Sequence, residues 1–307
     1  MTPREALAPY PSPEVREAEV DAHAARLGAD IVTYGHSVEG RALRAVRVPA
    51  RSGATPARVL CAANIHGVEW IAGRVALGLL ESLADPSEAL EALRARAEIW
   101  VIPSLNPDGY ARTWERAGVG RLASLRSNAR GVDLNRNFPL PFGAKPSWIP
   151  GTGSSQAGDV TYRGTAPLSE PETAALSALL ERVHFVASAN LHSFMGTLIP
   201  PKVTTRSDLE TYRRLCRAFA AGQRTHRYVR LASRLDVFTG EQEDHQHHVH
   251  GIWALTVEVF PVWASLRQHL RAPSTFWRFN PRRPETWVEN DVPGIAAFFL
   301  AALDTIR

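Results

Sequence analysis

The sequence contains few cysteines: Cys61 and Cys216 are the only two among its 307 residues, and each lies in an apolar or helical stretch. A framework of disulfide bonds is therefore not expected, and both side chains are interpreted as buried free thiols. Long apolar runs are also missing, since none approaches the ~20 residues that a membrane-spanning helix requires. Residues 1–10 lack an apolar segment behind a basic start. No signal peptide is predicted, and a cytoplasmic location is expected.

Runs of charge of one sign are absent too. The 35 Lys and Arg residues, almost all of them Arg, nearly balance 31 Asp and Glu residues, and they are scattered along the chain. A protein that binds nucleic acid would more often carry a basic stripe with interleaved aromatic residues, so neither nucleic acid nor membrane is an expected partner. The hydrophobic fraction of 45% and the charged fraction of 21% are typical of a globular protein with a substantial core.

Short apolar segments alternate with amphipathic ones along most of the chain. Strands are predicted over residues 31–34, 42–48, 58–63, 98–105, 184–191 and 252–260. Helices are predicted over residues 12–28, 70–83, 169–183 (opened by a capping box of Ser169 and Glu172), 208–223 and 292–306. Because the strands are too apolar to face water, we expect a mixed or mostly parallel sheet with helices on both faces. No repeat or linker is visible, so residues 1–307 are interpreted as one domain.

Polar residues that suit a metal site follow two of the predicted strands. His66 and Glu69 form an H-x-x-E pair where strand 58–63 gives way to a helix, and His192 follows strand 184–191. Ligands bind beyond the carboxyl ends of strands in such sheets. Imidazole and carboxylate are zinc ligands, and a catalytic zinc takes three protein ligands and keeps one position open. Each residue alone also fits an ordinary polar turn, but together they predict a metal site.

Other polar residues suit work on a substrate beside that metal. Glu258 lies in an apolar strand, where a carboxylate is costly to bury without a partner; it is either an ion-pair partner of an Arg or a general base. Arg126, Asn135 and Arg136 lie in the irregular stretch 109–164, and long loops of this kind often carry function. An Asn-Arg pair alone is usually surface decoration, but near zinc it would suit a substrate carboxylate.

Six segments, in the family's order, together resemble the M14 zinc carboxypeptidase family. They are Gly35-x-Ser37-x-x-Gly40-Arg41, Asn64-x-His66-x-x-Glu69-Trp70, Asn106-Pro107-Asp108-Gly109, Gly131-Val132-Asp133-Leu134-Asn135-Arg136-Asn137-Phe138, Leu191-His192-Ser193 and Thr256-x-Glu258. The resemblance implies a three-layer α/β/α sandwich around a mixed, mostly parallel eight-stranded sheet. It also implies one Zn²⁺ on His66, Glu69 and His192 and hydrolysis of a C-terminal peptide or amide bond by zinc-activated water.

The same resemblance implies a role for each of the remaining site residues. Glu258 would be the general acid/base, Arg126 would polarise the scissile carbonyl, and Asn135 with Arg136 would bind the terminal carboxylate of a peptide or peptide-like substrate. No propeptide-like segment precedes the helix that starts at Ser12, so a secreted zymogen is not expected.

Two departures concern the substrate. Members of the digestive branch have Arg where this chain has Val68, and they carry a Tyr about twenty residues before the catalytic Glu, where this chain has Phe238; Tyr228 lies further away. In both respects the chain resembles the bacterial branch that trims cell-wall peptides at γ-D-glutamyl–diaminopimelate bonds. A murein peptide amidase is therefore an alternative function. An N-acyl-amino-acid deacylase of the aspartoacylase type and an inactive zinc- or peptide-binding module are two others.

The segment of residues 241–250, EQEDHQHHVH, is unusually rich in histidine and carboxylates. Three interpretations stay open: a solvated polar loop, an acidic pocket that faces the substrate, and a second metal site. In the second case Glu243 or Asp244 would favour a basic group on the substrate.

Overall fold

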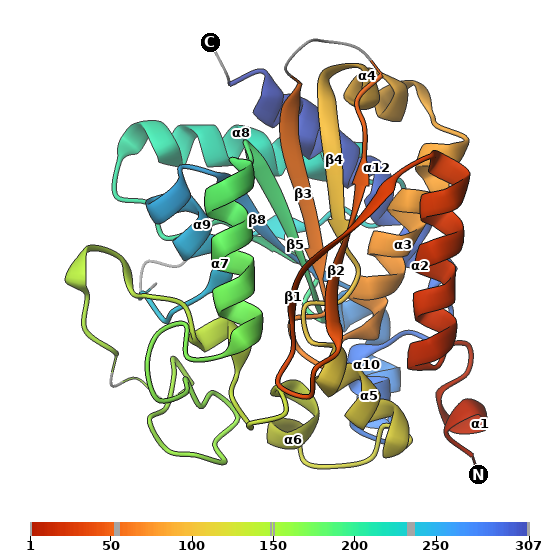
Figure 1. The fold of residues 1–307 in the computed structure, drawn as a ribbon, viewed down its shortest axis with the longest axis vertical. Coiled ribbons are helices and arrows are strands. Elements are labelled where there is room, and N and C mark those ends of the chain that lie inside the picture. The colour runs from red at the N-terminus through yellow and green to blue at the C-terminus, as the bar shows by residue number, and fades with distance from the viewer. Residues whose placement is uncertain (1, 52–55, 148, 150, 232–236, 306–307) are drawn as a thin grey trace.

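Eight strands form one mixed sheet in the computed structural model, which describes residues 2–51, 56–147, 149, 151–231 and 237–305 (Figure 1). The strands are β1 (Asp30–His36), β2 (Ala42–Val48), β3 (Ala57–Ala63), β4 (Ala97–Ile102), β5 (Ala187–Ser193), β6 (Thr197–Ile199), β7 (Val229–Arg230) and β8 (Trp253–Val259). Their order across the sheet is β1-β2-β4-β3-β5-β8-β6-β7. The central strands β4, β3, β5 and β8 are parallel, and β1 and β2 pair antiparallel with their neighbours. Strand β6 pairs antiparallel with β8 and parallel with β7. The predicted mixed, mostly parallel sheet is confirmed.

Helices cover both faces of this sheet and make it a three-layer sandwich. They are α1 (Pro3–Leu7), α2 (Pro13–Leu27), α3 (Trp70–Ala84), α4 (Glu88–Arg96), α5 (Pro107–Glu115), α6 (Leu122–Arg126), α7 (Pro171–Val183), α8 (Arg206–Gly222), α9 (Gln242–His250), α10 (Val262–Leu270), α11 (Phe276–Phe279) and α12 (Glu285–Leu303). Helix α7 lies over one face, and α8 and α12 lie over the other (Figure 1).

Side chains of the central strands alternate between two separate cores. In β3, Val59 and Cys61 pack in the core under α3, α8 and α12, whereas Leu60 and Ala62 pack in the core under α7. This period of two is the ordinary geometry of a strand. A strand buried on both faces reads as a continuous apolar run, which is why residues 58–63 could be predicted as central.

Most predicted elements are confirmed, with shifted ends. Strand β2 has the predicted bounds, but β4 stops at Ile102 and α12 begins at Glu285, seven residues before the predicted start; Ile306, the predicted end of that helix, lies outside the described residues. The predicted capping box of α7 is wrong. Glu170 is the N-cap, and the Ser169 hydroxyl donates to the Glu170 carboxylate instead of capping the helix.

Both cysteines are buried and free, as predicted. Within the described ranges, no helix combines the length and the apolar character needed to cross a membrane.

A buried carboxyl group joins α12 to the segment that follows α8. Asp291 accepts hydrogen bonds from Gln223 Nε2 at 2.7 Å and from the Tyr228 hydroxyl at 2.8 Å. Tyr228 in turn accepts a bond from the backbone N–H of Phe260, just beyond β8. Burial raises the pKa of Asp291 to about 7, because an ionised carboxylate is poorly solvated there.

This pKa makes the stability of the fold depend on pH in a defined direction. In the unfolded chain Asp291 ionises near pH ~4, whereas in the folded protein it keeps its proton up to about pH 7. The folded state therefore binds more protons inside this window, and the free energy of unfolding falls as pH rises through it. An Asp291→Asn variant should lack this pH-dependent part of the free energy of unfolding, which is ~4 kcal/mol at most. Urea unfolding of both proteins across the window measures it. A difference between them that is constant with pH would contradict a protonated Asp291.

Candidate active site

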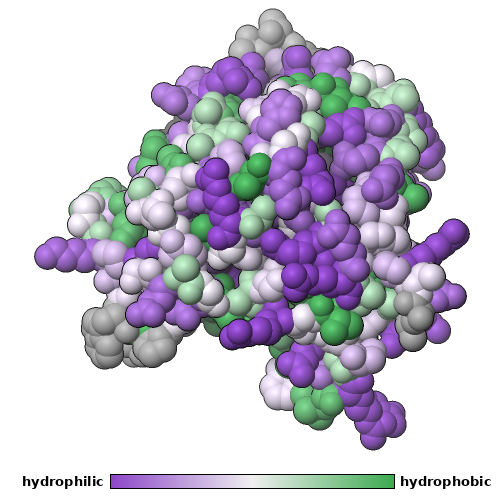
Figure 2. All heavy atoms as spheres, turned by 60° about the horizontal axis from the view of Figure 1, so that its bottom comes forward, coloured by the Kyte–Doolittle hydropathy of each residue, from purple (hydrophilic) through white to green (hydrophobic). Residues whose placement is uncertain are grey.

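The carboxyl ends of three neighbouring parallel strands bring the predicted site residues together. The 64–69 segment follows β3, His192 lies near the end of β5, and Glu258 lies near the end of β8. His192 and Glu258 are direct partners in the β5–β8 register, so the two side chains point to the same side of the sheet edge. Hydrophilic residues gather in the middle of the molecular face at this end (Figure 2).

His66, Glu69 and His192 form a group that could hold a metal ion. One ligand atom from each residue lies within 4.8 Å of the others, and all three side chains are buried. The Nδ1 atoms of His66 and His192 lie 2.8 and 3.1 Å from the two carboxylate oxygens of Glu69. In the part of the chain that the structure describes, this is the only such group of three or more residues.

The protonation states of this group suit a divalent cation. Burial alone would raise the pKa of Glu69, but the contacts with His66 and His192 outweigh it and hold the pKa below its ordinary value. Burial lowers the pKa of His192, which favours the neutral imidazole that binds metals. Two imidazole nitrogens and one carboxylate are a catalytic zinc donor set, so the residues fit the ion.

Glu258 and Arg126 lie beside this group. Burial and the negative charge of Glu69 raise the pKa of Glu258 to about 8, and its Oε2 atom is buried with no partner among the described residues. The Arg126 guanidinium is 3.8 Å from the Glu69 carboxylate. The arrangement thus combines a candidate metal site with a proton acceptor and a cation.

Asp133 is a site residue that sequence reasoning missed. Its Oδ1 atom lies 3.1 Å from His66 Nε2 and accepts the backbone N–H of Asn135, while its Oδ2 atom accepts the Arg126 Nε–H at 2.9 Å. Burial would raise the pKa of Asp133, but Arg126 and His66 keep it well below its usual range. A histidine that donates from Nε2 to Asp133 presents its Nδ1 lone pair to a metal. The signal was present, since Asp133 lies two residues before Asn135, but the segment was interpreted only as a carboxylate clamp.

The loop after β3 is held by a second set of missed residues. Asn64 has a positive φ of 55°, donates to the carbonyl of His66 and accepts from the Ser104 hydroxyl. A Cβ atom on Gly67 would lie 2.5 Å from the backbone of Gly109, so only glycine fits at this contact. The 106–109 motif thus buttresses the loop that carries the metal-binding pair.

Asn135 and Arg136 lie in the one-turn 3₁₀ helix η1 (Leu134–Arg136) that follows Asp133. The side-chain oxygen of Asn135 accepts the backbone N–H of Gln242, which leaves its amide nitrogen as the group for another contact. Arg136 donates to the carbonyl of Asn135 and forms an ion pair with Glu241 at 3.0 Å. The guanidinium that was predicted to bind a substrate carboxylate is therefore paired with Glu241, a carboxylate of the chain itself.

The histidine-rich segment is helix α9, so its interpretation as a solvated polar loop is wrong. Residues 242–246 are buried, and α9 packs against β5, β8 and α7. Gln246 bonds with Asn190 and Ser188 of β5, and His245 Nε2 lies 3.0 Å from the Ser177 hydroxyl of α7. Its histidines form no second metal-binding group among the described residues.

The acidic side chains of this segment divide into two kinds. Asp244 accepts the backbone N–H of Lys202. Glu243 is buried, and its Oε2 atom has no hydrogen-bond partner within the described ranges. Burial, reinforced by the nearby charges of Glu241 and Asp244, raises the pKa of Glu243 well above its ordinary value. A cationic neighbour would stabilise the ionised form of such a group, so the interpretation as an acidic pocket stays open.

Tyr228 does not take the place of the tyrosine that the digestive branch carries. Tyr228 is buried in the Asp291 network. Phe238 is half-buried; it contacts the rings of Phe142 and His248, and the Lys202 ammonium lies 4.9 Å from its ring centre.

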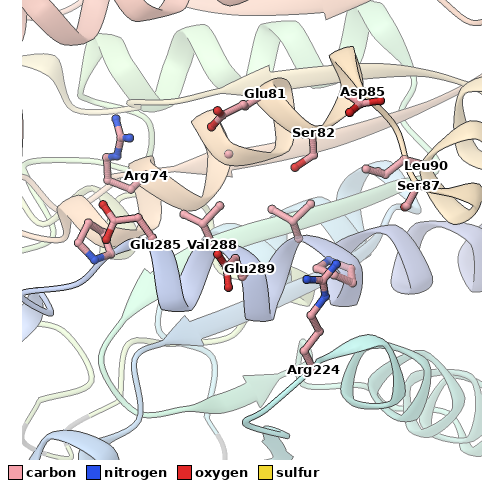
Figure 3. Close-up of a pocket in the computed structure, with 14 residues that line it drawn as sticks. Arg74, Glu81, Ser82, Asp85, Ser87, Leu90, Arg224, Glu285, Val288 and Glu289 are labelled. Atoms are coloured by element: carbon pink, nitrogen blue, oxygen red, sulfur yellow. The ribbon is translucent and has the colours of Figure 1, made fainter.

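A separate groove of about 400 Å³ runs between α3 and α12 (Figure 3). Arg74 and Glu81 come from α3, Glu285 and Glu289 come from α12, and Arg224 lies at one end. None of the metal-site residues lines this groove, so it is distinct from the candidate active site.

The fold and the site together define an α/β sandwich with a candidate divalent-metal centre at the carboxyl ends of its central strands. Residues 25–268 match the peptidase M14 family of zinc carboxypeptidases, and the chain belongs to this family.

Individual relatives agree with this membership. The chain is 32% identical over 181 residues to a metallocarboxypeptidase A-like protein of Trichophyton verrucosum, a match that covers 56% of the chain and 41% of the relative. It is 31% identical over 234 residues to carboxypeptidase D of Rattus norvegicus, covering 63% of the chain and 16% of the relative. The chain therefore spans less than half the length of these relatives.

Solved structures show the same fold. Bovine thrombin-activatable fibrinolysis inhibitor, in complex with tick carboxypeptidase inhibitor, aligns with a TM-score of 0.77 at 20% identity, covering 97% of this chain and 98% of that one. The predicted three-layer zinc carboxypeptidase fold is confirmed.

We expect His66→Ala and His192→Ala to lose bound zinc, because each removes one of three ligands and two remaining donors hold the ion weakly. Metal analysis after dialysis should give about one zinc per wild-type chain and close to none in either variant. His248→Ala, which alters a histidine of α9 outside the group, is the matched control and should retain zinc. Zinc retained by both site variants but lost in the control would place the metal in α9.

Proposed function

We propose that the chain is a zinc-dependent metallocarboxypeptidase that hydrolyses the C-terminal peptide or amide bond of a peptide-like substrate. The observation that carries this proposal is the convergence of His66, Glu69 and His192 with Glu258 next to them in the β5–β8 register. When bound, zinc would supply Lewis acidity and lower the pKa of the attacking water. The three ligands would hold it, and Asp133 would orient His66.

Glu258 would act as the general base and then as the general acid. Its carboxylate takes a proton from the attacking water and later gives a proton to the departing amine. A cation on Glu69 would offset the negative charge that now raises the pKa of Glu258, and so would bring this pKa closer to neutrality. A pKa in that range lets one carboxyl group both accept and donate.

Arg126 and the η1 segment would position the substrate. Arg126 is held by Asp133 and lies close enough to the metal group to stabilise negative charge on the scissile carbonyl oxygen. Arg136 would pair with the terminal carboxylate, and the free amide nitrogen of Asn135 would add a hydrogen bond. A clamp for a terminal carboxylate makes the enzyme an exopeptidase.

We expect Glu258→Gln to keep zinc but to lower kcat at least ~10²-fold, because an amide of the same shape cannot accept a proton from water. Steady-state kinetics and metal analysis on one preparation separate these effects. Glu210→Gln, an exposed substitution on α8 with the same loss of charge, should leave kcat unchanged. A Glu258→Gln enzyme with most of its kcat would remove this residue from the mechanism.

A matched pair of peptides, one a free acid and one a C-terminal amide, tests the carboxylate clamp. Hydrogen bonds to charged groups contribute roughly 1.5–3 kcal/mol, so the amide should have at least ~10-fold lower kcat/KM. This preference should disappear in Arg136→Ala and nearly so in Arg136→Lys, because an ammonium does not reproduce the planar guanidinium.

The outcomes of this assay separate the alternatives. Equal hydrolysis of both peptides by the wild type would contradict the clamp and would move the N-acyl-amino-acid deacylase to first place. Hydrolysis of neither, with cleavage of a γ-D-glutamyl–diaminopimelate peptide, would favour the murein peptide amidase. Zinc binding without hydrolysis of any of them would favour a binding module.

A further inference from the structure

Glu241 lies where a substrate carboxylate would have to bind if the proposed function is correct. Its carboxylate is 3.0 Å from a terminal nitrogen of Arg136, the guanidinium assigned to the terminal carboxylate. Only 12% of the Arg136 side chain and 24% of the Glu241 side chain are exposed, so the pair is partly desolvated. The same Arg136 nitrogen also donates to the carbonyl of Asn135.

The backbone around Glu241 is fixed against the η1 segment on both sides. The carbonyl of Gly240 accepts the N–H of Phe138, and the N–H of Gln242 donates to the Asn135 side chain at 2.9 Å. Gly240 has a φ of +87°, and a Cβ atom there would lie 2.8 Å from the carbonyl oxygen of Arg136. The contact with Arg136 is therefore built into the chain and is not a chance meeting of two flexible side chains.

Arg136 has limited room for a second carboxylate. Its Nε atom is buried without a partner among the described residues, and one terminal nitrogen is engaged by Glu241. A substrate carboxylate obtains both terminal nitrogens only by displacing Glu241. If it binds beside Glu241 instead, it gains one contact and is repelled by a like charge. In both cases Glu241 weakens the binding of a terminal carboxylate.

We propose that Glu241 is a specificity-determining residue that disfavours departing residues without a positive charge and favours those that carry a cationic group. A neutral residue brings only its carboxylate and leaves the displaced Glu241 unpaired in a partly desolvated site. A residue with an ammonium or guanidinium side chain supplies a new partner for that carboxylate.

Two peptides that differ only in the last residue, lysine or norleucine, test this proposal on the zinc-loaded enzyme. The two side chains have the same carbon chain and differ in the ammonium group. The wild type should prefer the lysine peptide at least ~10-fold in kcat/KM, which corresponds to ~1.4 kcal/mol. In Glu241→Gln the KM for the norleucine peptide should fall at least ~5-fold, and the preference for lysine should shrink by about the same factor or more. Inhibition constants of free lysine and free norleucine should change in the same way, which gives a readout that does not depend on the chemical step.

The control variant is Glu210→Gln, which removes one negative charge from an exposed side chain of α8 and should leave the lysine preference unchanged. The proposal would be overturned if Glu241→Gln kept the preference for the lysine peptide unchanged. It would also be overturned if the wild type showed no such preference, a result that does not depend on the folding of any variant. These failures differ from failure of the proposed function. If the proposed function itself were wrong, the wild type would not distinguish a free-acid peptide from its C-terminal amide at all.

Discussion

Glu69 is a buried carboxylate between two imidazole rings, and the rest of the site is arranged around it. A carboxylate in such a place is costly unless hydrogen bonds and positive charge compensate it. His66 and His192 supply contacts from either side, the backbone N–H of Ser193 donates to it, and Arg126 lies 3.8 Å away. Because β3 and β5 are neighbours in a parallel sheet, these groups come from two strand ends that the fold already places together. A divalent cation would complete the compensation, so the carboxylate that is costly to bury is the one that would bind the metal.

Asp133 connects this centre to the part of the site that would grip the substrate. One carboxylate meets His66 and Arg126 and caps the η1 turn that carries Asn135 and Arg136. The orientation of His66, of Arg126 and of the η1 backbone, which are the proposed metal ligand, carbonyl-polarising cation and carboxylate clamp, thus depends on a single side chain. A charge-assisted hydrogen bond is stronger and better oriented than a neutral one, which explains why a fully buried Asp is used here.

The sequence could predict much of this fold because the informative signals are local. Apolar runs such as 58–63 identify strands that are buried on both faces, and strand ends identify where polar residues converge. Helix α9 could not be predicted in the same way. Its polar residues are buried by long-range partners, Gln246 by Asn190 and His245 by Ser177, and composition alone favours a solvated loop. The start of α12 was missed because Pro284 and the polar residues 289–291 interrupt the apolar pattern of a helix that packs on α3 and α8.

The pairing of Arg136 with Glu241 illustrates a limit of transferring roles by motif. The motif that contains Asn135 and Arg136 predicts a free guanidinium, but the charge that a ligand meets also depends on residues about a hundred positions further along the chain. Gly240, by its close approach to the carbonyl oxygens of Arg136 and Phe138, brings Glu241 to that guanidinium. The local charge at the clamp is then near zero before a substrate arrives, because Glu241 is paired with Arg136. A substrate carboxylate therefore meets a guanidinium whose charge Glu241 already offsets, and what accompanies that carboxylate decides how well it binds.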